Sequence, residues 1–374
     1  MTSPLLHDIL NQSTSLAAAV DYHFGAGRAA LYDAARLLNG QAILFSGMGS
    51  SLYACYALSA ELAQQGVAAT LIDTAEMLHY HYRAYRDTVA VLVSRSGESI
   101  ETIKLLPLLK AQGTRIIGVT DVADSALARE ADATILIHGG KDYLVAVQSY
   151  TATLIALQLL GTALLDANRD GSLPSTPNEV SERAVRMPGV AARPADFGQM
   201  RPELDALIAL LARYIPLCVE QSEGWRSFFD GAQAIHLLGR GRSIASIYEG
   251  SLLFNEVAKF PAVPMTAAQF RHGPVEIVDE RYRAIVFAPN DHTRALNIAL
   301  ARDLNRLGGQ VRLIGPEAAD QGWWPTPNVP AALAPLIDIV PVQCAAMRLA
   351  EWRGFTPGEF RVATQVTRSE AGFE

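Results

Sequence analysis

Short apolar runs alternate with helical patterns over the first 165 residues. After a helical N-terminal segment at 5–38, apolar runs predict five strands, at 41–46, 67–72, 88–94, 114–120 and 132–137. Apolar residues at helical spacing predict further helices, at 52–65, 98–112 and 149–165. Continuous apolar strands that alternate with helices are typical of a parallel sheet covered on both faces.

The same alternation resumes after a polar stretch. Residues 166–200 are rich in Pro, Ser, Asn and charge, which is typical of a linker between domains. Beyond it we predict strands at 234–239, 284–288, 310–314 and 337–340, helices at 243–258, 292–307 and 342–353, and a loop at 323–327. The chain is therefore predicted to be an α/β protein with two tandem, three-layer α/β/α domains of flavodoxin-like build. The predicted divisions are an N-terminal helical segment 1–40, a first domain 41–168, a linker 169–200, a second domain 201–345, and a C-terminal helix and tail 346–374.

An internal repeat supports two related domains. A shift of 192 residues places nine residues of the first half on identical residues of the second half, with no gap: Ala42, Ile43, Gly47, Gly49, Ser51, Tyr56, Ser59, Thr74 and Ala75. A duplication explains this constant offset. The alternative is that any two α/β units share a glycine-rich turn between a strand and a helix.

Composition limits the class of protein. The 374 residues include 31 Lys and Arg and 38 Asp and Glu, for a net charge of −7, which argues against a nucleic-acid or anionic-membrane partner. Three distant cysteines without a CxxC pair indicate neither a disulfide framework nor a zinc site. The N-terminus lacks the pattern of a signal peptide, and we find no apolar run of about 20 residues. We therefore expect a cytoplasmic protein.

A glycine-rich loop follows the first predicted strand of the chain. Its sequence is GMGSS, so that Gly49 lets the backbone turn tightly while Ser50 and Ser51 offer hydroxyl groups. The helix that follows presents unpaired N–H groups and the positive end of its dipole, which together favour an anion. The alternative is an ordinary turn with a serine N-cap.

A second loop, SRSGES, lies at the end of the third predicted strand. Three hydroxyls and a glycine at a helix start can hold a phosphate, and an arginine adds charge; the residues are Ser94, Arg95, Ser96 and Ser99. A capping box would explain one of these hydroxyls but not three. Ligands bind outside the carboxyl ends of strands in open α/β sheets, which is where this loop lies. Neither loop matches a dinucleotide or ATP fingerprint, so we expect no cofactor.

At these loops the chain resembles the sugar isomerase (SIS) superfamily, and most closely the isomerase half of glucosamine-6-phosphate synthase and its free-standing relatives. The residues that carry the resemblance are GMGSS at 47–51, SRSGES at 94–99, ADSxLAxxAD at 123–132, LGRG at 238–241, YEGSL at 248–252 and QFRHGP at 269–274. The likeness covers about residues 5–370. The chain has no counterpart of the synthase's amide-hydrolysing half, so we expect no glutamine-dependent synthesis.

The resemblance implies a site that takes a phosphorylated sugar or amino sugar. By motif position, Ser50, Ser51, Ser94, Ser96 and Ser99 would bind the phosphate, with Arg95 nearby. Glu256 stands where the family has the glutamate that moves a proton between C1 and C2 of the open-chain sugar. His272 stands where the family has the histidine that helps to open the ring, often from a neighbouring subunit, so the resemblance also implies a homodimer.

The chemistry agrees with these residue types. A carbonyl shift needs a base that takes a C–H proton and returns it to the next carbon, as a carboxylate with a raised pKa does. Opening a ring needs a group that titrates near neutrality, such as histidine. The alternatives are that Glu256 is a solvated helix residue and that His272 is a structural turn residue. Glu249 is a further acidic candidate with a structural role in the family.

The chain departs from the family at three places. In the segment 141–151, Lys141 replaces a glutamate, Val147 a threonine and Gln148 a basic residue. No lysine occupies 364 or 365, where Thr364 and Gln365 stand, and Leu253 replaces the synthase's helix lysine. By position, Gly49, Ala146, Gln148, Thr364 and Gln365 are further candidate sugar contacts. A missing lysine removes a positive charge and an amine that could form an imine.

Two functions follow from the sequence. The first is a phosphosugar aldose–ketose isomerase or an amino-sugar-phosphate deaminase, and the alternative is a protein that binds a sugar phosphate without turning it over. A polar-aromatic cluster at 79–82 contains His79 and His81, but two histidines at i and i+2 do not share a helix face. We therefore expect no metal site.

Overall fold

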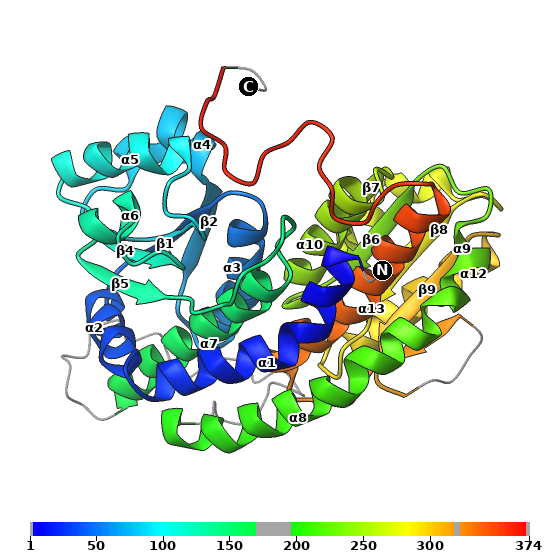
Figure 1. The fold of residues 1–374 in the computed structure, drawn as a ribbon, viewed down its shortest axis with the longest axis horizontal. Coiled ribbons are helices and arrows are strands. Elements are labelled where there is room, and N and C mark those ends of the chain that lie inside the picture. The colour runs from blue at the N-terminus through cyan, green and yellow to red at the C-terminus, as the bar shows by residue number, and fades with distance from the viewer. Residues whose placement is uncertain (1–2, 170–195, 318–321, 372–374) are drawn as a thin grey trace. The chain divides into compact units, whose positions relative to one another are not determined.

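The computed structural model describes residues 3–169, 196–317 and 322–371 (Figure 1). Most of the predicted linker 169–200 lies outside these residues. Contacts within the chain define two compact units, each with one sheet. Unit 1 comprises Met1–Leu16, Gly140–Thr151 and Ala206–Gln365, and unit 2 comprises Ala17–Gly139, Ala152–Asp205 and Val366–Glu374.

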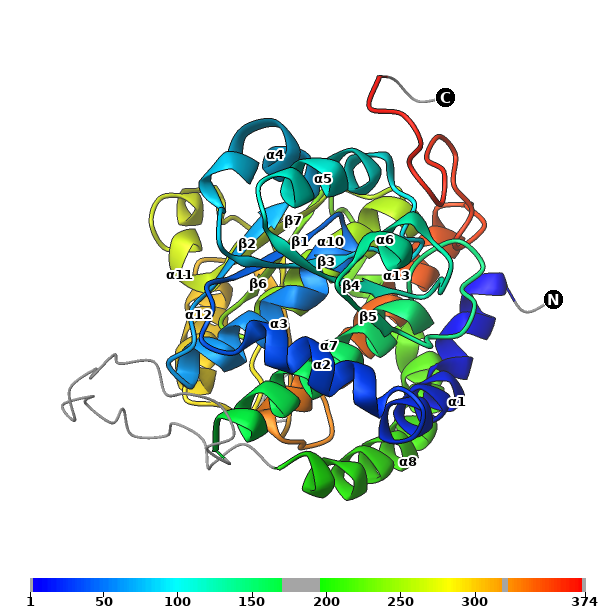
Figure 2. The ribbon, with the colours of Figure 1, turned by 90° about the vertical axis from the view of Figure 1, so that its left-hand side faces the viewer.

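Unit 2 contains a parallel sheet of five strands in the order β2-β1-β3-β4-β5, with helices on its two faces (Figures 1 and 2). The strands are β1 (Ile43–Gly47), β2 (Ala69–Asp73), β3 (Val89–Val93), β4 (Arg115–Thr120) and β5 (Ala133–Leu136). The helices are α2 (Arg28–Leu38), α3 (Ser50–Gln64), α4 (Thr74–Glu76), α5 (Ile100–Ala111), α6 (Ala126–Glu130) and most of α7 (Gln148–Arg169). All residues of β1 and β3 are buried, which explains why their sequences are continuously apolar.

Unit 1 repeats this architecture with the strand order β10-β9-β8-β6-β7. Its strands are β6 (Ile235–Gly239), β7 (Ala262–Thr266), β8 (Arg283–Phe287), β9 (Gln310–Gly315) and β10 (Trp323–Pro325). Its helices are α9 (Arg226–Phe229), α10 (Ser243–Val257), α11 (Ala267–Phe270), α12 (Arg294–Arg306), α13 (Ala334–Trp352) and most of α8 (Phe197–Gln221). Both sheets thus have the flavodoxin-like order, which confirms the predicted fold class.

The predicted strand at 337–340 was wrong, since these residues lie within α13. A short apolar run cannot distinguish a buried strand from a buried helix, and nearly all of α13 is buried. The two outer positions that the sequence did not assign as strands are β7 and β10. In β10, Trp324 is buried and stacks on Trp225 at a centroid distance of 5.1 Å, so the predicted loop at 323–327 contains a short edge strand.

The helical segment predicted at 5–38 is two helices, α1 (Pro4–Phe24) and α2. The break falls at 25–27, where Gly27 packs against the ring of Tyr22. A Cβ at Gly27 would lie 2.4 Å from Tyr22 Cε1, so the close turn needs a glycine.

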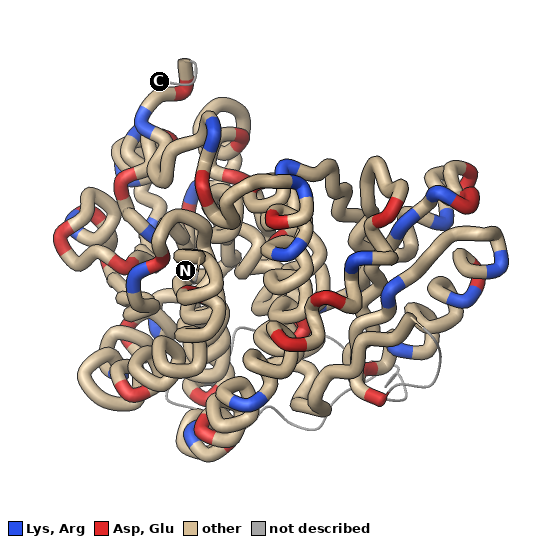
Figure 3. Tube along the Cα trace, turned by 45° about the vertical axis from the view of Figure 1, so that its right-hand side comes forward, with Lys and Arg blue, Asp and Glu red and all other residues tan. Residues whose placement is uncertain are grey.

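Two helical stretches in the described residues are long and apolar enough to span a membrane, Gln148–Ala167 and Ala331–Trp352. This differs from the sequence-based expectation, because scattered polar residues interrupt the apolar runs without lowering the mean hydropathy below 1.3. The protein itself buries 78% and 89% of the two windows, as in core helices of folded domains, so they are weak evidence for a membrane. Acidic and basic residues are interspersed along the chain (Figure 3).

Candidate functional site

The two predicted phosphate loops start side by side in unit 2. β1 and β3 are parallel neighbours, and their last residues, Gly47 and Val93, are paired in register. The residues that follow therefore leave the same edge of the sheet together, one loop leading to α3 and the other to α5. This is the point where the strand order reverses, which is where flavodoxin-like sheets bind ligands.

Glycines make the close approach of these loops possible. A Cβ at Gly47 would lie 2.8 Å from the carbonyl oxygen of Val93. Gly49 and Gly97 have φ values of 51° and 63°, in the left-handed region. A Cβ at Gly97 would also lie 2.2 Å from Ser125 Oγ, so this loop is packed directly against the start of α6.

The loop hydroxyls accept bonds from their own backbone. Ser94 Oγ accepts from the N–H of Gly97 at 3.1 Å, and Ser96 Oγ accepts from the N–H of Glu98 at 3.2 Å. A hydroxyl that accepts in this way keeps its proton for donation to a ligand. Ser99 precedes α5 and its hydroxyl pairs with that of Thr102 at 2.7 Å.

Glu98 and Arg95 fasten the loop to its neighbours. Glu98 Oε1 accepts from the N–H of Ala126 at 2.6 Å, at the start of α6. The carbonyl oxygen of Arg95 accepts from the N–H of Asp121 and from the hydroxyl of Thr120. Glu98 was not a predicted site residue, and its carboxylate holds the loop. Ser50, Ser51 and Ser96 are partly exposed at the carboxyl ends of the strands.

The C-terminal segment contacts α5 within unit 2. The carbonyl oxygen of Thr367 accepts from the N–H of Ile100 at 3.1 Å, at the first helical residue. Glu370 pairs with Lys104 and with His79 Nε2. Both partners lower the pKa of the Glu370 carboxyl group, and Lys104 has the larger effect. His79 thus has a partner that the sequence did not indicate. The described residues contain no cluster of three or more His, Cys, Asp or Glu that could hold a metal ion.

Glu256 lies near the end of α10 in unit 1. Burial raises the pKa of its carboxyl group to about 7, and the nearby Lys259 opposes this shift. Lys259 follows the helix with φ of 51°, and its ammonium donates to the carbonyl oxygen of Glu256 at 2.9 Å. Lys259 was not among the residues predicted from the sequence, because the family's helix lysine precedes the glutamate, at the position of Leu253. Glu249 is buried, at 1% exposure, whereas Glu256 is partly exposed.

His272 lies in an exposed turn after α11. Its N–H donates to the carbonyl oxygen of Gln269 at 2.9 Å, and Gly273 has φ of 121°. Thr364 and Gln365, near the end of unit 1, are also exposed. These side chains are accessible in the single chain.

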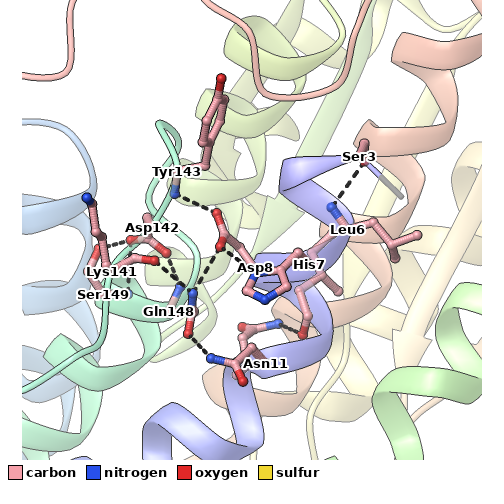
Figure 4. Close-up of polar contacts among 12 residues, drawn as sticks. Ser3, Leu6, His7, Asp8, Asn11, Lys141, Asp142, Tyr143, Gln148 and Ser149 are labelled. Atoms are coloured by element: carbon pink, nitrogen blue, oxygen red, sulfur yellow. Dashed lines mark hydrogen bonds and ion pairs between the residues drawn. The ribbon is translucent and has the colours of Figure 1, made fainter. Parts of the chain in front are cut away.

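The segment that departs from the family is tied to α1 by a buried polar cluster in unit 1 (Figure 4). Gln148 Nε2 donates to Asp8 Oδ1 at 3.0 Å, and Gln148 Oε1 accepts from Asn11 at 2.8 Å. Asp142 accepts from the N–H groups of Gln148 and Ser149 and so caps α7. Burial, and to a smaller extent the Asp8 charge, raises the pKa of Asp142.

This cluster defines what the unusual residues do in the fold. Gln148 has 1% exposure, and its side-chain amide forms hydrogen bonds with Asp8, Asn11 and the carbonyl oxygen of Lys141. Lys141 is exposed, and Ala146 is partly exposed. The role of Ala146 and Gln148 as sugar contacts stays a prediction.

Residues 37–163 match the family model of the SIS domain. The chain is 25% identical over 377 residues to the glutamine–fructose-6-phosphate aminotransferase (isomerizing) of Pyrococcus horikoshii, which covers 97% of this chain and 57% of the relative. It is 28% identical over 323 residues to the enzyme of the same name from Brucella abortus, covering 83% of this chain and 49% of the relative. The chain thus spans about half the length of these curated relatives.

Solved structures share the fold across nearly the whole chain. The C-terminal domain of glucosamine-fructose-6-phosphate aminotransferase from Francisella tularensis has a TM-score of 0.79 at 18% identity, with 95% of this chain and 97% of that one covered. Glucosamine-6-phosphate deaminase from Thermotoga maritima has a TM-score of 0.72 at 18% identity, with 98% and 99% covered. At these identities the likeness concerns the fold.

Proposed function

Because residues 37–163 match the family model of the SIS domain, we propose that the chain acts on a phosphorylated sugar or amino sugar, as an aldose–ketose isomerase or an amino-sugar-phosphate deaminase. The observation that carries the proposal is the pair of hydroxyl-bearing loops at the reversal point of the first sheet. The relatives are named as enzymes of fructose 6-phosphate, and the structural neighbours include enzymes of glucosamine 6-phosphate and tagatose 6-phosphate.

The phosphate is bound by Ser50, Ser51, Ser94, Ser96 and Ser99, with Arg95 contributing charge. Two features support this assignment. The backbone bonds to Ser94 and Ser96 orient their hydroxyls as donors, and α3 and α5 both begin at this edge. Gly49 allows the backbone to approach the ligand.

Glu256 carries the proton between the two sugar carbons. A carboxyl group with a pKa of about 7 exchanges protons readily at neutral pH, and burial supplies that value here. Lys259 keeps part of the carboxyl population ionised, as a base requires. We propose that His272 opens the ring and that it is donated across the interface of a homodimer, which agrees with its exposure in the single chain.

The second candidate is a protein that binds a sugar phosphate without reaction. The departures at Lys141, Val147 and Gln148 and the absence of lysine at 364 and 365 favour it. Gln148 is buried in the cluster with Asp8, so the basic residue of the family is replaced by a structural amide.

Solvent deuterium exchange tests the enzyme. The protein is incubated in D2O with 6-phosphorylated hexoses, hexosamines and fructosamines, and label at C1 or C2 is followed by NMR. We expect exchange that Glu256→Gln lowers by at least about 10²-fold and that Glu276→Gln, an exposed glutamate of the same unit, leaves intact. Tight binding without exchange across the panel would reject the proposed enzyme activity and support a protein that only binds a sugar phosphate.

A binding experiment tests the phosphate loop separately. We expect Ser96→Ala to weaken phosphorylated ligands by about tenfold, because one charge-assisted hydrogen bond is lost. Unphosphorylated sugars should bind as before, and Ser59→Ala, further along α3, should change neither. Equal weakening of both kinds of sugar would show that this loop does not hold the phosphate.

A further inference from the structure

The second sheet has the same reversal point as the first. In the order β10-β9-β8-β6-β7, the reversal lies between β6 and β8, which pair with Leu238 opposite Val286. α10 follows β6 and α12 follows β8, as α3 and α5 follow β1 and β3. The two loops share a backbone hydrogen bond. After β8 the N–H of Ala288 donates to the carbonyl oxygen of Ile314, as the N–H of Ser94 after β3 donates to the carbonyl oxygen of Val119. The duplication therefore supplies a second edge suited to a ligand.

Three arginines lie at this second edge, and one of them, Arg294, pairs with Glu317 at 3.5 Å. Arg240 and Arg242 stand in the loop before α10, and Arg294 begins α12. Burial lowers the pKa of the Arg240 guanidinium, and the positive charge of Arg271 adds to this effect. The one carboxylate of the 288–293 loop, Asp291, accepts from the N–H and hydroxyl of Thr293.

Two buried donors at this edge lack partners among the described residues. Asn297 has 0% exposure; its Oδ1 accepts from Arg240 Nε at 3.0 Å, while its Nδ2 has no partner. Ser243 has 1% exposure, begins α10, and its hydroxyl also has no partner there. A buried donor left without an acceptor costs about 1–3 kcal/mol. The bond to Arg240 fixes the Asn297 amide against the loop, so an acceptor bound at this edge would satisfy it.

We propose that this edge is a second binding site, which takes the phosphate group of a small molecule on Arg240, Asn297 and Ser243. A phosphate supplies several acceptor oxygens and a negative charge to two amide hydrogens, a hydroxyl and the arginines. The site is separate from Glu256, because 13 residues of α10 at 1.5 Å each put about 20 Å between Ser243 and Glu256. It therefore goes beyond the proposed catalytic function.

The test measures phosphate binding to the full chain with Ser96→Ala, which weakens the proposed first site. Inorganic phosphate and glucose 6-phosphate are titrated by calorimetry in a low-salt buffer free of phosphate. We expect saturable binding that Arg240→Gln weakens by at least about tenfold. Asn297→Asp keeps the shape and the acceptor for Arg240 but replaces the free donor with a negative charge, and should abolish binding.

The control is Arg281→Gln. Arg281 is an exposed arginine before β8, at the amino ends of the strands, and its replacement should leave binding unchanged. Tighter binding of glucose 6-phosphate than of inorganic phosphate would identify an ester as the ligand, and equal binding would identify the free anion. The proposal is overturned if the Ser96→Ala protein shows no saturable binding, or if Arg240→Gln and Asn297→Asp both leave it unchanged. Neither result depends on the deuterium exchange that tests the proposed function.

Discussion

The reversal points of the two sheets share a topology and differ in chemistry. Between β1 and β3 the loops carry serines, whose hydroxyl groups can donate hydrogen bonds. Between β6 and β8 the corresponding loops carry arginines, and Asn290 and Thr293 replace Ser96 and Ser99. Strand order thus determines where a ligand can bind, while the loop residues determine which ligand binds there.

The loops also differ in how firmly they are packed. Gly97 has a left-handed φ and touches Ser125, whereas Gly241 has φ of 54° with nothing within 4 Å of an added Cβ. The 94–99 loop is packed tightly against the start of α6 at Gly97, whereas the 240–242 loop has open space at Gly241 and is joined to α12 by the hydrogen bond from Arg240 to Asn297.

The largest expected effect follows from this difference in packing. Gly97→Ala should lower the free energy of unfolding by about 3 kcal/mol, because backbone strain adds to a steric clash. Gly241→Ala should cost only about 1 kcal/mol, from strain alone. Chemical denaturation of both variants measures the contrast. Equal losses would show that Ser125 yields to the added methyl group and that the steric clash contributes nothing.

The second expectation concerns the pH dependence of the proposed proton transfer. A base must be ionised, so exchange should rise with pH through about 7, the pKa of Glu256. Lys259 favours the ionised carboxylate, so Lys259→Met should raise the pKa of Glu256 and move this rise upward by up to about one pH unit. The measurement is the pH–rate profile of deuterium exchange.

Lys259→Arg serves as the control for this shift, since it keeps the charge near Glu256 and should restore the profile. Phosphate binding at the second edge should not follow the same titration, because Glu256 lies at the other end of α10. A Lys259→Met profile identical to that of the unchanged protein would remove Lys259 from the proposed site.

The sequence predicted much of this comparison, but not all of it. The apolar strands and the 192-residue offset were enough to predict two related sheets, because buried strands leave a continuous pattern. The same criterion mistook residues 337–340 for a strand, since every face of α13 is buried. It also could not show that Asn297 lies against Arg240, because 57 residues separate them and only the sheet brings them together.

Local patterns likewise gave candidates without their partners. SRSGES predicted the position of the serines, and the structure adds that Glu98 reaches α6. Gln148 was chosen for its place in a motif, whereas its bond to Asp8 joins residues 140 positions apart. Long-range polar contacts of this kind leave no periodic signal in one sequence.

A smaller effect is expected at Asp291, the carboxylate among the arginines. Asp291→Asn keeps an acceptor for Thr293 and removes one negative charge, so phosphate should bind the second edge about three times more tightly. Calorimetry on the Ser96→Ala background measures this change. Asp279→Asn, at the amino end of β8, is the control and should leave the affinity unchanged. Weaker binding in Asp291→Asn would mean that the carboxylate shapes the loop rather than repels the ligand.

The smallest expected effect separates the first edge from the second through the C-terminal segment. Glu370 neutralises Lys104 on α5 and holds the segment whose Thr367 carbonyl occupies the N–H of Ile100. Glu370→Gln should free the Lys104 ammonium and the N–H of Ile100. A phosphorylated sugar should then bind up to about twofold more tightly at low salt, with no difference at 0.5 M salt. Glu130→Gln breaks the matching pair with Lys110 at the other end of α5 and should have no effect. Since the contacts of Glu370 belong to unit 2, binding at the arginine edge should also stay the same, and a gain there would indicate a general change in surface charge.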